Sequence, residues 1–217
     1  MALIYRGPAS TPGCPEAAQA LLVASDPQLR IRFVGPREAT ALSPAVLAQA
    51  CLYVQPGGPS LRRSYRLLHR HRDAITHYVR SGGRYLGLCL GGYLAGCTPG
   101  FGLLPGDAHR YIDTAASGVT GPGDTIVELT WAGTPRPVFF QDGPTFTLHT
   151  RNRVDILATY PNGHPAALVT PYGHGVVGVV GPHPEATPDW FLDAGIPLPS
   201  RLAIDLGVDL IRQVMSR

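Results

Sequence analysis

Lysine is missing from this sequence, because all 18 basic residues are arginine. Its absence excludes a catalytic side-chain amine and a Schiff base formed on a side chain of this chain. Charge of either sign is sparse: charged residues make up 15% of the chain, and the formal net charge is +3. So small an excess gives little attraction to a polyanion. We therefore do not expect nucleic acid as a partner.

Long apolar runs are also lacking. No stretch reaches the roughly 18 apolar residues that a membrane helix needs, and the N-terminus shows no signal-peptide pattern. We expect no membrane attachment and a cytoplasmic location. The four cysteines, Cys14, Cys51, Cys89 and Cys97, have neither zinc-ligand nor Cys-x-x-Cys spacing. This predicts free thiols in a reducing compartment, with no metal and no other cofactor.

Short apolar segments and helical segments alternate in the first part of the chain. Strands are predicted at residues 2–6, 29–34, 51–55 and 83–88, with helices at 16–24, 43–50 and 60–80 between them, the last one capped by Ser60. This order predicts a parallel sheet covered by helices on both faces. The 217 residues suit one α/β domain over residues 1–217.

From residue 101 onward, strand patterns dominate. They fall at residues 125–131, 138–140, 145–148, 154–160, 166–170 and 175–180. Gln141-Asp142-Gly143-Pro144 is predicted to be the turn of a hairpin between 138–140 and 145–148. Helices are predicted at 188–194 and 200–215.

The segment Gly87-Leu88-Cys89-Leu90-Gly91 predicts a sharp turn between a strand and a helix. Glycine two residues before and after Cys89 lets the backbone bend tightly, as in a nucleophile elbow. The N-terminus of the following helix favours a thiolate at Cys89, and the backbone N–H of Leu90 would face a developing oxyanion. The alternative is a buried structural cysteine.

The segment Gly181-Pro182-His183-Pro184-Glu185 follows the last predicted strand. Because the carboxyl ends of parallel strands share one edge of a sheet, His183 and Glu185 are expected to meet Cys89 there. Cys89 would attack an acyl carbon, His183 would transfer the proton, and Glu185 would orient the imidazole. The alternatives are a turn histidine and a solvated carboxylate.

Three further positions are candidates at the same edge of the sheet. Gly58, after the third strand, could supply a second oxyanion donor beside Leu90, or belong to a plain turn. Cys14, after the first strand, could be a second active-site thiol, although a structural role is favoured. Asp142 could line the pocket or only form its turn.

Three motifs, Pro56-Gly57-Gly58, Gly87-Leu88-Cys89-Leu90-Gly91 and Gly181-Pro182-His183-Pro184-Glu185, resemble in this order the class I glutamine amidotransferase superfamily. The resemblance implies a flavodoxin-like three-layer α/β sandwich with a mostly parallel central sheet, here with an added β-hairpin region, and a Cys-His-Glu triad. We expect the substrate to contact Gly57, Tyr93, Asp142 and Gly143.

A narrower resemblance rests on Tyr5-Arg6-Gly7-Pro8, Gly13-Cys14-Pro15, residues 139–144 and the final Gly-Pro-His-Pro-Glu. These segments look like the biotin-protein ligase N-terminal-like family. In that family, such a domain precedes a biotin ligase in some eukaryotic proteins and stands alone in bacteria. Nothing of a ligase catalytic domain is present in these 217 residues.

Tyr93 departs from the amidotransferase pattern, which has glutamine four residues after the nucleophile. This puts glutamine in doubt as the substrate. The leading hypothesis is a cysteine hydrolase or amidotransferase-like enzyme acting on a small amide or related acyl compound. The alternatives are a non-catalytic binding or regulatory module and an ammonia source for a partner synthetase or ligase.

Arginines cluster between residues 60 and 80. Such a cluster can bind phosphate or nucleic acid, but no aromatic stacking pattern accompanies it, so a solvated helix face is favoured. The members of the run are Arg62, Arg63, Arg66, Arg70 and Arg72, with His69 and His71.

Overall fold

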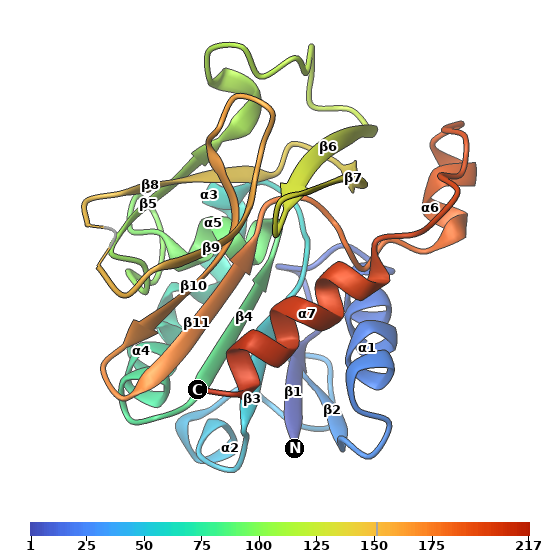
Figure 1. Cartoon of the computed structure of the whole chain (residues 1–217). Coiled ribbons are helices and arrows are strands. Elements are labelled where there is room, and N and C mark those ends of the chain that lie inside the picture. The colour runs from blue at the N-terminus through green and yellow to red at the C-terminus, as the bar shows by residue number, and fades with distance from the viewer. Residues whose placement is uncertain (151) are drawn as a thin grey trace.

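The computed structural model describes residues 1–150 and 152–217. A nine-stranded sheet in the order β2-β1-β3-β4-β11-β10-β9-β6-β7 runs through the molecule (Figure 1). Its first five strands are parallel to one another. They are β2 (Ile31–Val34), β1 (Ala2–Tyr5), β3 (Leu52–Gln55), β4 (Arg84–Leu88) and β11 (Gly175–Val180).

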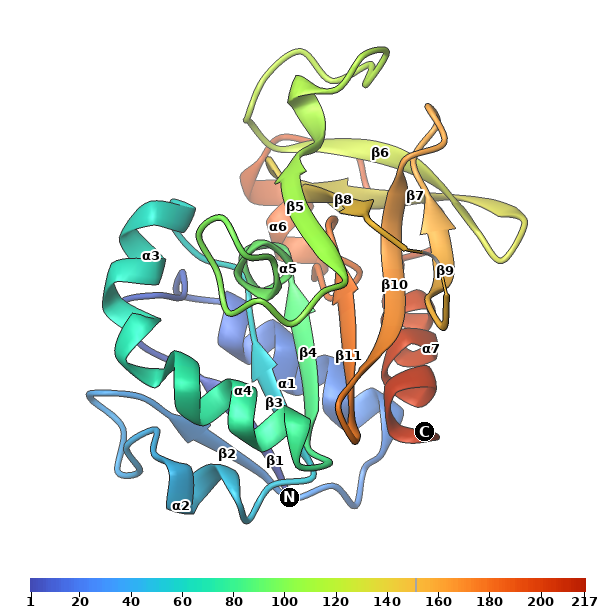
Figure 2. The ribbon, with the colours of Figure 1, turned by 90° about the vertical axis from the view of Figure 1, so that its left-hand side faces the viewer.

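Helices cover both faces of the parallel strands (Figure 2). On one face, α1 (Cys14–Ser25) and α7 (Ile204–Met215) pack side by side. The other face carries α2 (Pro44–Leu47), α3 (Leu61–Leu68), α4 (Arg72–Arg80) and α5 (Leu90–Ala95). Each face buries its own apolar cluster, so the predicted three-layer α/β fold is confirmed.

The predicted strands of the second half are present, but one predicted pairing is wrong. The strand β7 (Thr134–Phe140) pairs along its length with β6 (Thr125–Trp131), and β8 (Pro144–Leu148) pairs with β5 (Gly106–Arg110) in a separate small sheet. The hairpin turn therefore lies at Ala132 and Gly133, whose positive φ values of 47° and 83° suit a tight two-residue connection. Residues 141–143 instead link the two sheets. Strands β9 (Asp155–Thr159) and β10 (Pro165–Tyr172) complete the antiparallel extension.

The helix predicted over 60–80 is broken. A 3-10 turn, η1 (His69–His71), separates α3 from α4, and the Ser60 side chain makes no capping hydrogen bond. The break gives each half its own inward side, with Leu68 buried on α3 and Ile75 on α4. The arginines of this run are exposed, as predicted.

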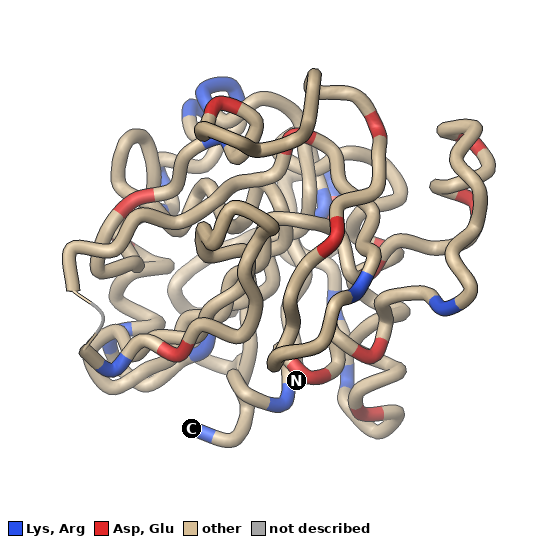
Figure 3. Tube along the Cα trace, turned by 45° about the horizontal axis from the view of Figure 1, so that its top comes forward, with Lys and Arg blue, Asp and Glu red and all other residues tan. Residues whose placement is uncertain are grey.

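Two short elements complete the chain, η2 (Tyr111–Asp113) and α6 (Pro188–Asp193). Acidic and basic positions are interspersed along the trace (Figure 3). Over the part of the chain that the structure describes, every helix is too short or too polar to cross a membrane.

Candidate active site

Cys89 lies at the turn between β4 and α5 in a strained conformation, with φ 47° and ψ −101°. Its backbone N–H donates to the Val180 carbonyl of β11 at 2.9 Å, which fixes the turn against the sheet. A Cβ on Gly87 would come within 2.5 Å of the Gly91 backbone, and one on Gly91 would collide with the Gln55 carbonyl. The strand and helix approach so closely that only glycine fits at both positions, and the turn holds Cys89 in its positive-φ conformation.

His183 lies just beyond the end of β11. Its backbone N–H donates to the Phe139 carbonyl at 2.8 Å, and the ring packs edge-on against Trp190 with centroids 5.1 Å apart. The ring Nδ1 donates to Glu185 Oε1 at 2.8 Å, since a carboxylate only accepts. The two side chains are 3% and 0% exposed, respectively. Glu185 therefore fixes both the orientation and the tautomer of the imidazole.

The other ring nitrogen, Nε2, interacts with Cys89, whose side chain contributes to the raised pKa of His183, but no hydrogen bond of ordinary geometry joins the two. Among the described residues, His183 Nε2 and Glu185 Oε2 are buried without a hydrogen-bond partner. His183 and Cys89 line the same pocket, which has a volume of about 530 Å³. Burial lowers the pKa of His183, but the negative charges of Cys89 and Glu185 outweigh that effect and raise it well above its usual range. The site thus holds a base whose second nitrogen is available to a ligand.

The predicted oxyanion donors lie together at this pocket. Gly58 and Leu90 both line it, and a Cβ on Gly58 would come within 2.6 Å of the Leu90 side chain. Neither backbone N–H has an acceptor among the described residues. Two N–H groups are therefore free near Cys89.

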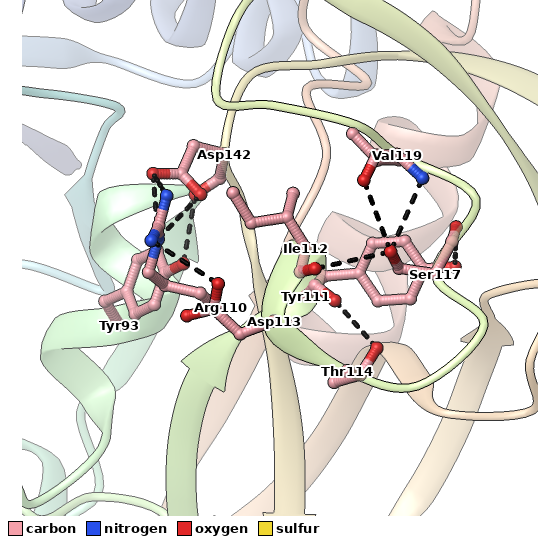
Figure 4. Close-up of polar contacts among 9 residues, drawn as sticks. All are labelled: Tyr93, Arg110, Tyr111, Ile112, Asp113, Thr114, Ser117, Val119 and Asp142. Carbon is pink, nitrogen blue, oxygen red and sulfur yellow. Dashed lines mark hydrogen bonds and ion pairs between the residues drawn. The ribbon is translucent and has the colours of Figure 1, made fainter.

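Tyr93 of α5 and Asp142 also line the pocket, and Figure 4 shows both of them beside Arg110. The Tyr93 hydroxyl donates to the Asp142 carbonyl at 3.0 Å, and the Asp142 side chain pairs with Arg110 of β5 at 3.0 Å. The adjacent Gln141 carbonyl lies 3.7 Å from the Cys89 sulfur, within reach of an S–H hydrogen bond. Tyr93 thus holds a turn of the pocket wall, and burial raises its pKa.

Two of the predicted substrate contacts are not part of the pocket lining. A Cβ on Gly57 would come within 2.9 Å of His183 Cε1 and 3.1 Å of the Cys14 sulfur, so this glycine makes room for both. Gly143 packs against the Gly181 carbonyl. Their observed contacts are close backbone approaches, which glycine alone allows.

Cys14 does line the pocket, at the first turn of α1. Burial raises the pKa of its thiol, and the charges of Glu185 and Cys89 raise it further. Sequence analysis did not single out Arg110 or identify Arg62 as part of the pocket lining. Arg62 belongs to the arginine run that the sequence assigns to a solvated helix face, and Arg110 belongs to no motif, so only the fold brings them to the site.

Residues 1–103 match the family described as biotin-protein ligase, N terminal. The chain is 28% identical over 211 residues to the biotin–protein ligase of Schizosaccharomyces pombe, covering 84% of this chain and 33% of that protein. The chain therefore spans about a third of the length of this curated relative.

Solved structures share the fold. A crystal structure of glutamine amidotransferase superposes with a TM-score of 0.63 at 17% identity, covering 89% of this chain and 99% of that one. A putative GMP synthase subunit from Thermoplasma acidophilum superposes with a TM-score of 0.59 at 10% identity, covering 100% and 92%. The predicted resemblance to the biotin-protein ligase N-terminal family is confirmed over residues 1–103, and the solved structures show that the chain shares the fold of a glutamine amidotransferase.

Proposed function

We propose that this chain is a cysteine hydrolase or amidotransferase-like enzyme in which Cys89, His183 and Glu185 act together on a small amide or related acyl compound. One observation carries the proposal: His183 Nε2 is buried, has no partner among the described residues and belongs to a group that lines the Cys89 pocket. A buried polar atom without a hydrogen bond is costly, so its retention calls for an explanation. Proton transfer to a ligand supplies one.

The first half-reaction would form a thioester. The Cys89 sulfur attacks the substrate carbonyl carbon, and the oxygen takes the negative charge within reach of the Gly58 and Leu90 N–H groups. The imidazolium of His183 then gives its proton to the leaving nitrogen, and the C–N bond breaks. The raised pKa of His183 favours the proton-carrying form that this step requires.

The second half-reaction would return the enzyme to its starting state. Neutral His183 takes a proton from water, whose oxygen attacks the thioester carbon and releases a carboxylic acid and the Cys89 thiolate. Glu185 holds Nδ1 throughout and stabilises the cation each time it forms. The released amine or ammonia leaves the pocket or passes to a separate synthetase or ligase.

The second candidate is a non-catalytic binding or regulatory module. The relative lengths of the two proteins favour this second candidate, since this chain spans only a third of the biotin–protein ligase that it resembles. A domain within so long a protein can serve the activity of the rest of that protein. Reactivity at Cys89 separates the two candidates, because a binding module needs no activated thiol.

The test is alkylation by iodoacetamide at pH 7, followed by mass spectrometry of all four cysteines. We expect Cys89, which is 7% exposed, to react before the exposed Cys97. His183→Ala should slow alkylation of Cys89 about tenfold or more, because the thiolate loses its cationic neighbour. His174→Ala, at the surface turn between β10 and β11, is the matched control. If Cys97 reacts first and His183→Ala changes nothing, the enzyme proposal fails.

A further inference from the structure

We infer that the substrate carries a negatively charged group, a carboxylate or a phosphate, and that Arg62 binds it at the mouth of the pocket. This inference rests on the proposed function, since it names the class of compound on which Cys89 would act. It follows from the charges of the pocket lining, from the start of helix α3 and from the unpartnered His183 nitrogen.

Arg62 is the uncompensated charge of the lining. It is the second residue of α3, it lies at the exposed surface and, within the described residues, it forms no hydrogen bond or ion pair. The other lining arginine, Arg110, is held by two hydrogen bonds from its Nε and one from its Nη2 to the Asp142 carboxylate. Asp113 lies 3.5 Å from Arg110 Nη1 and is not part of the lining. Asp142 is therefore already neutralised, and Arg62 is left to attract an anion.

The beginning of α3 supports the same ligand. Ser60 lines the pocket, and its hydroxyl makes no capping bond, so it is free to donate. The first backbone N–H of α3 with an acceptor is that of Ser64, which leaves those of Leu61, Arg62 and Arg63 unused among the described residues. Unused N–H groups and the positive end of a helix favour an anion. The guanidinium of Arg62 adds a fork that matches carboxylate or phosphate oxygens.

The buried His183 nitrogen points independently to a ligand in this pocket. Because His183 lies beside Cys89, the substrate carbonyl that reacts would lie at the buried end of the pocket. Arg62 lies at the exposed rim of the same pocket. The volume of about 530 Å³ is within the ordinary range for small-molecule sites. The substrate that fits both ends is a small amide or acyl compound with its anionic group away from the carbonyl that Cys89 attacks.

The experiment compares matched electrophiles, so that no substrate needs to be known. Bromoacetamide derivatives are prepared with a carboxylate at increasing distance, as in N-bromoacetylglycine, N-bromoacetyl-β-alanine and N-bromoacetyl-γ-aminobutyrate. Each is paired with its neutral primary amide, and a second set carries a phosphonate. The measured quantity is the ratio of the Cys89 alkylation rates for the anionic and neutral members of each pair, normalised to the same ratio for glutathione.

We expect at least one anionic probe to exceed its neutral partner by about fivefold to tenfold, as one partly exposed charge-assisted contact allows. Arg62→Ala should lower the ratio of the anionic to the neutral alkylation rate to about one. Arg66→Ala, on the same helix but outside the pocket lining, is the matched control and should keep the preference. The probe set with the larger ratio identifies the anionic group.

The outcomes separate this inference from the proposed function. Fast alkylation of Cys89 by the neutral probes, with no anionic preference or one that survives Arg62→Ala, overturns the anionic substrate and leaves the enzyme proposal intact. If Cys89 is unreactive toward every probe, the proposed function fails, and the inference fails with it. A preference lost equally in Arg66→Ala reflects the general field of α3 and also overturns the assignment to Arg62.

Discussion

The parallel strands and the antiparallel extension meet where β11 pairs with β10, and they differ in how they are buried. Strands β1, β3 and β11 are buried at every residue, because helices cover both of their faces. Strand β6 instead alternates buried and exposed residues along most of its length, as a sheet with one solvated face does. We therefore expect most substitutions in the parallel strands to destabilise the protein. The exposed positions of β6 can be substituted at little cost in stability.

The two regions also contribute different walls of the pocket. Cys89 and His183 follow the parallel strands β4 and β11, whereas Asp142 and Arg110 come from the antiparallel part. We expect this division to separate the proposed chemistry from substrate choice. Loops and strand ends of the extension can vary while the paired strands β4 and β11 keep the reacting groups in register.

The largest effect is expected from a change in the parallel region. In Gly91→Ala the added Cβ meets the Gln55 carbonyl, a backbone atom that cannot move aside without shifting β3. We expect a loss of about 3 kcal/mol or more in the free energy of unfolding, measured by urea denaturation. Gly133→Ala, at the β6–β7 turn with φ +83° and open space around it, should cost only about 1 kcal/mol.

Gly121→Ala provides the baseline for this series, because nothing lies within 4 Å of its Cβ position and its φ is not in the left-handed region. It should unfold like the wild type. Equal losses for Gly91→Ala and Gly133→Ala would contradict the contrast between the two regions.

A smaller effect is expected at Tyr93, where the two regions touch. We expect the wild type to release ammonia from millimolar glutamine weakly or not at all relative to Cys89→Ala, because the Tyr93 hydroxyl is already bound to the Asp142 carbonyl. A polar contact missing from the substrate site costs about 1–3 kcal/mol, or roughly tenfold to a hundredfold in rate. Robust turnover that depends on Cys89 would refute this expectation.

Tyr93→Phe isolates the structural part of this contact. It removes one hydrogen bond and leaves the Asp142 carbonyl unsatisfied, so we expect the protein to lose about 1 kcal/mol of stability. The freed turn should also expose Cys89 to faster alkylation, because the Gln141 carbonyl near its sulfur is no longer held. An unchanged alkylation rate would show that Tyr93 does not support this wall.

Much of the parallel region could be predicted from the sequence. Its strands, its helices and the turn at Cys89 follow from local apolar periodicity and from glycines that allow close approach. The pairing of β7 could not be predicted in the same way. Gln141-Asp142-Gly143-Pro144 has the composition of a hairpin turn, and local composition does not reveal that β5, more than 30 residues earlier, pairs with β8.

The residues of the candidate site also differ in whether the sequence could predict them. The positions of Cys89, His183 and Glu185 could be predicted because each follows a strand of the parallel sheet in a Gly- or Pro-marked turn. Arg62 could not, because it belongs to an arginine run that is typical of a solvated helix face, and Arg110 could not, because a single arginine in a strand carries no local signal. Arg62 reaches the pocket from the start of α3, and the place of Arg110 depends on the pairing of β5 with β8.

The smallest effect is expected at Asp107 of β5, and its dependence on pH appears only in acid. Its Oδ1 accepts from the Cys97 N–H at 2.8 Å and from the Ala108 N–H at 2.9 Å, which ties the loop after α5 to the small sheet. Burial alone would raise the pKa of this carboxyl, but its hydrogen bonds from Thr98, Cys97 and Ala108 lower it to about 2. Because the folded pKa lies below the unfolded value of about 3.9, the carboxylate adds stability that is fully present above pH 4.

That contribution is lost as the pH falls through about 2, where the folded form also takes up the proton. We therefore expect the stability difference between the wild type and Asp107→Asn, measured by urea denaturation, to be constant from pH 7 to about 4.5 and to shrink below pH 4. Asp73→Asn, whose parent side chain is 98% exposed, is the control and should show a much flatter difference. A difference between wild type and Asp107→Asn that grows on acidification would mean that the carboxyl is held in its protonated form, and that the loop after α5 is anchored by other contacts.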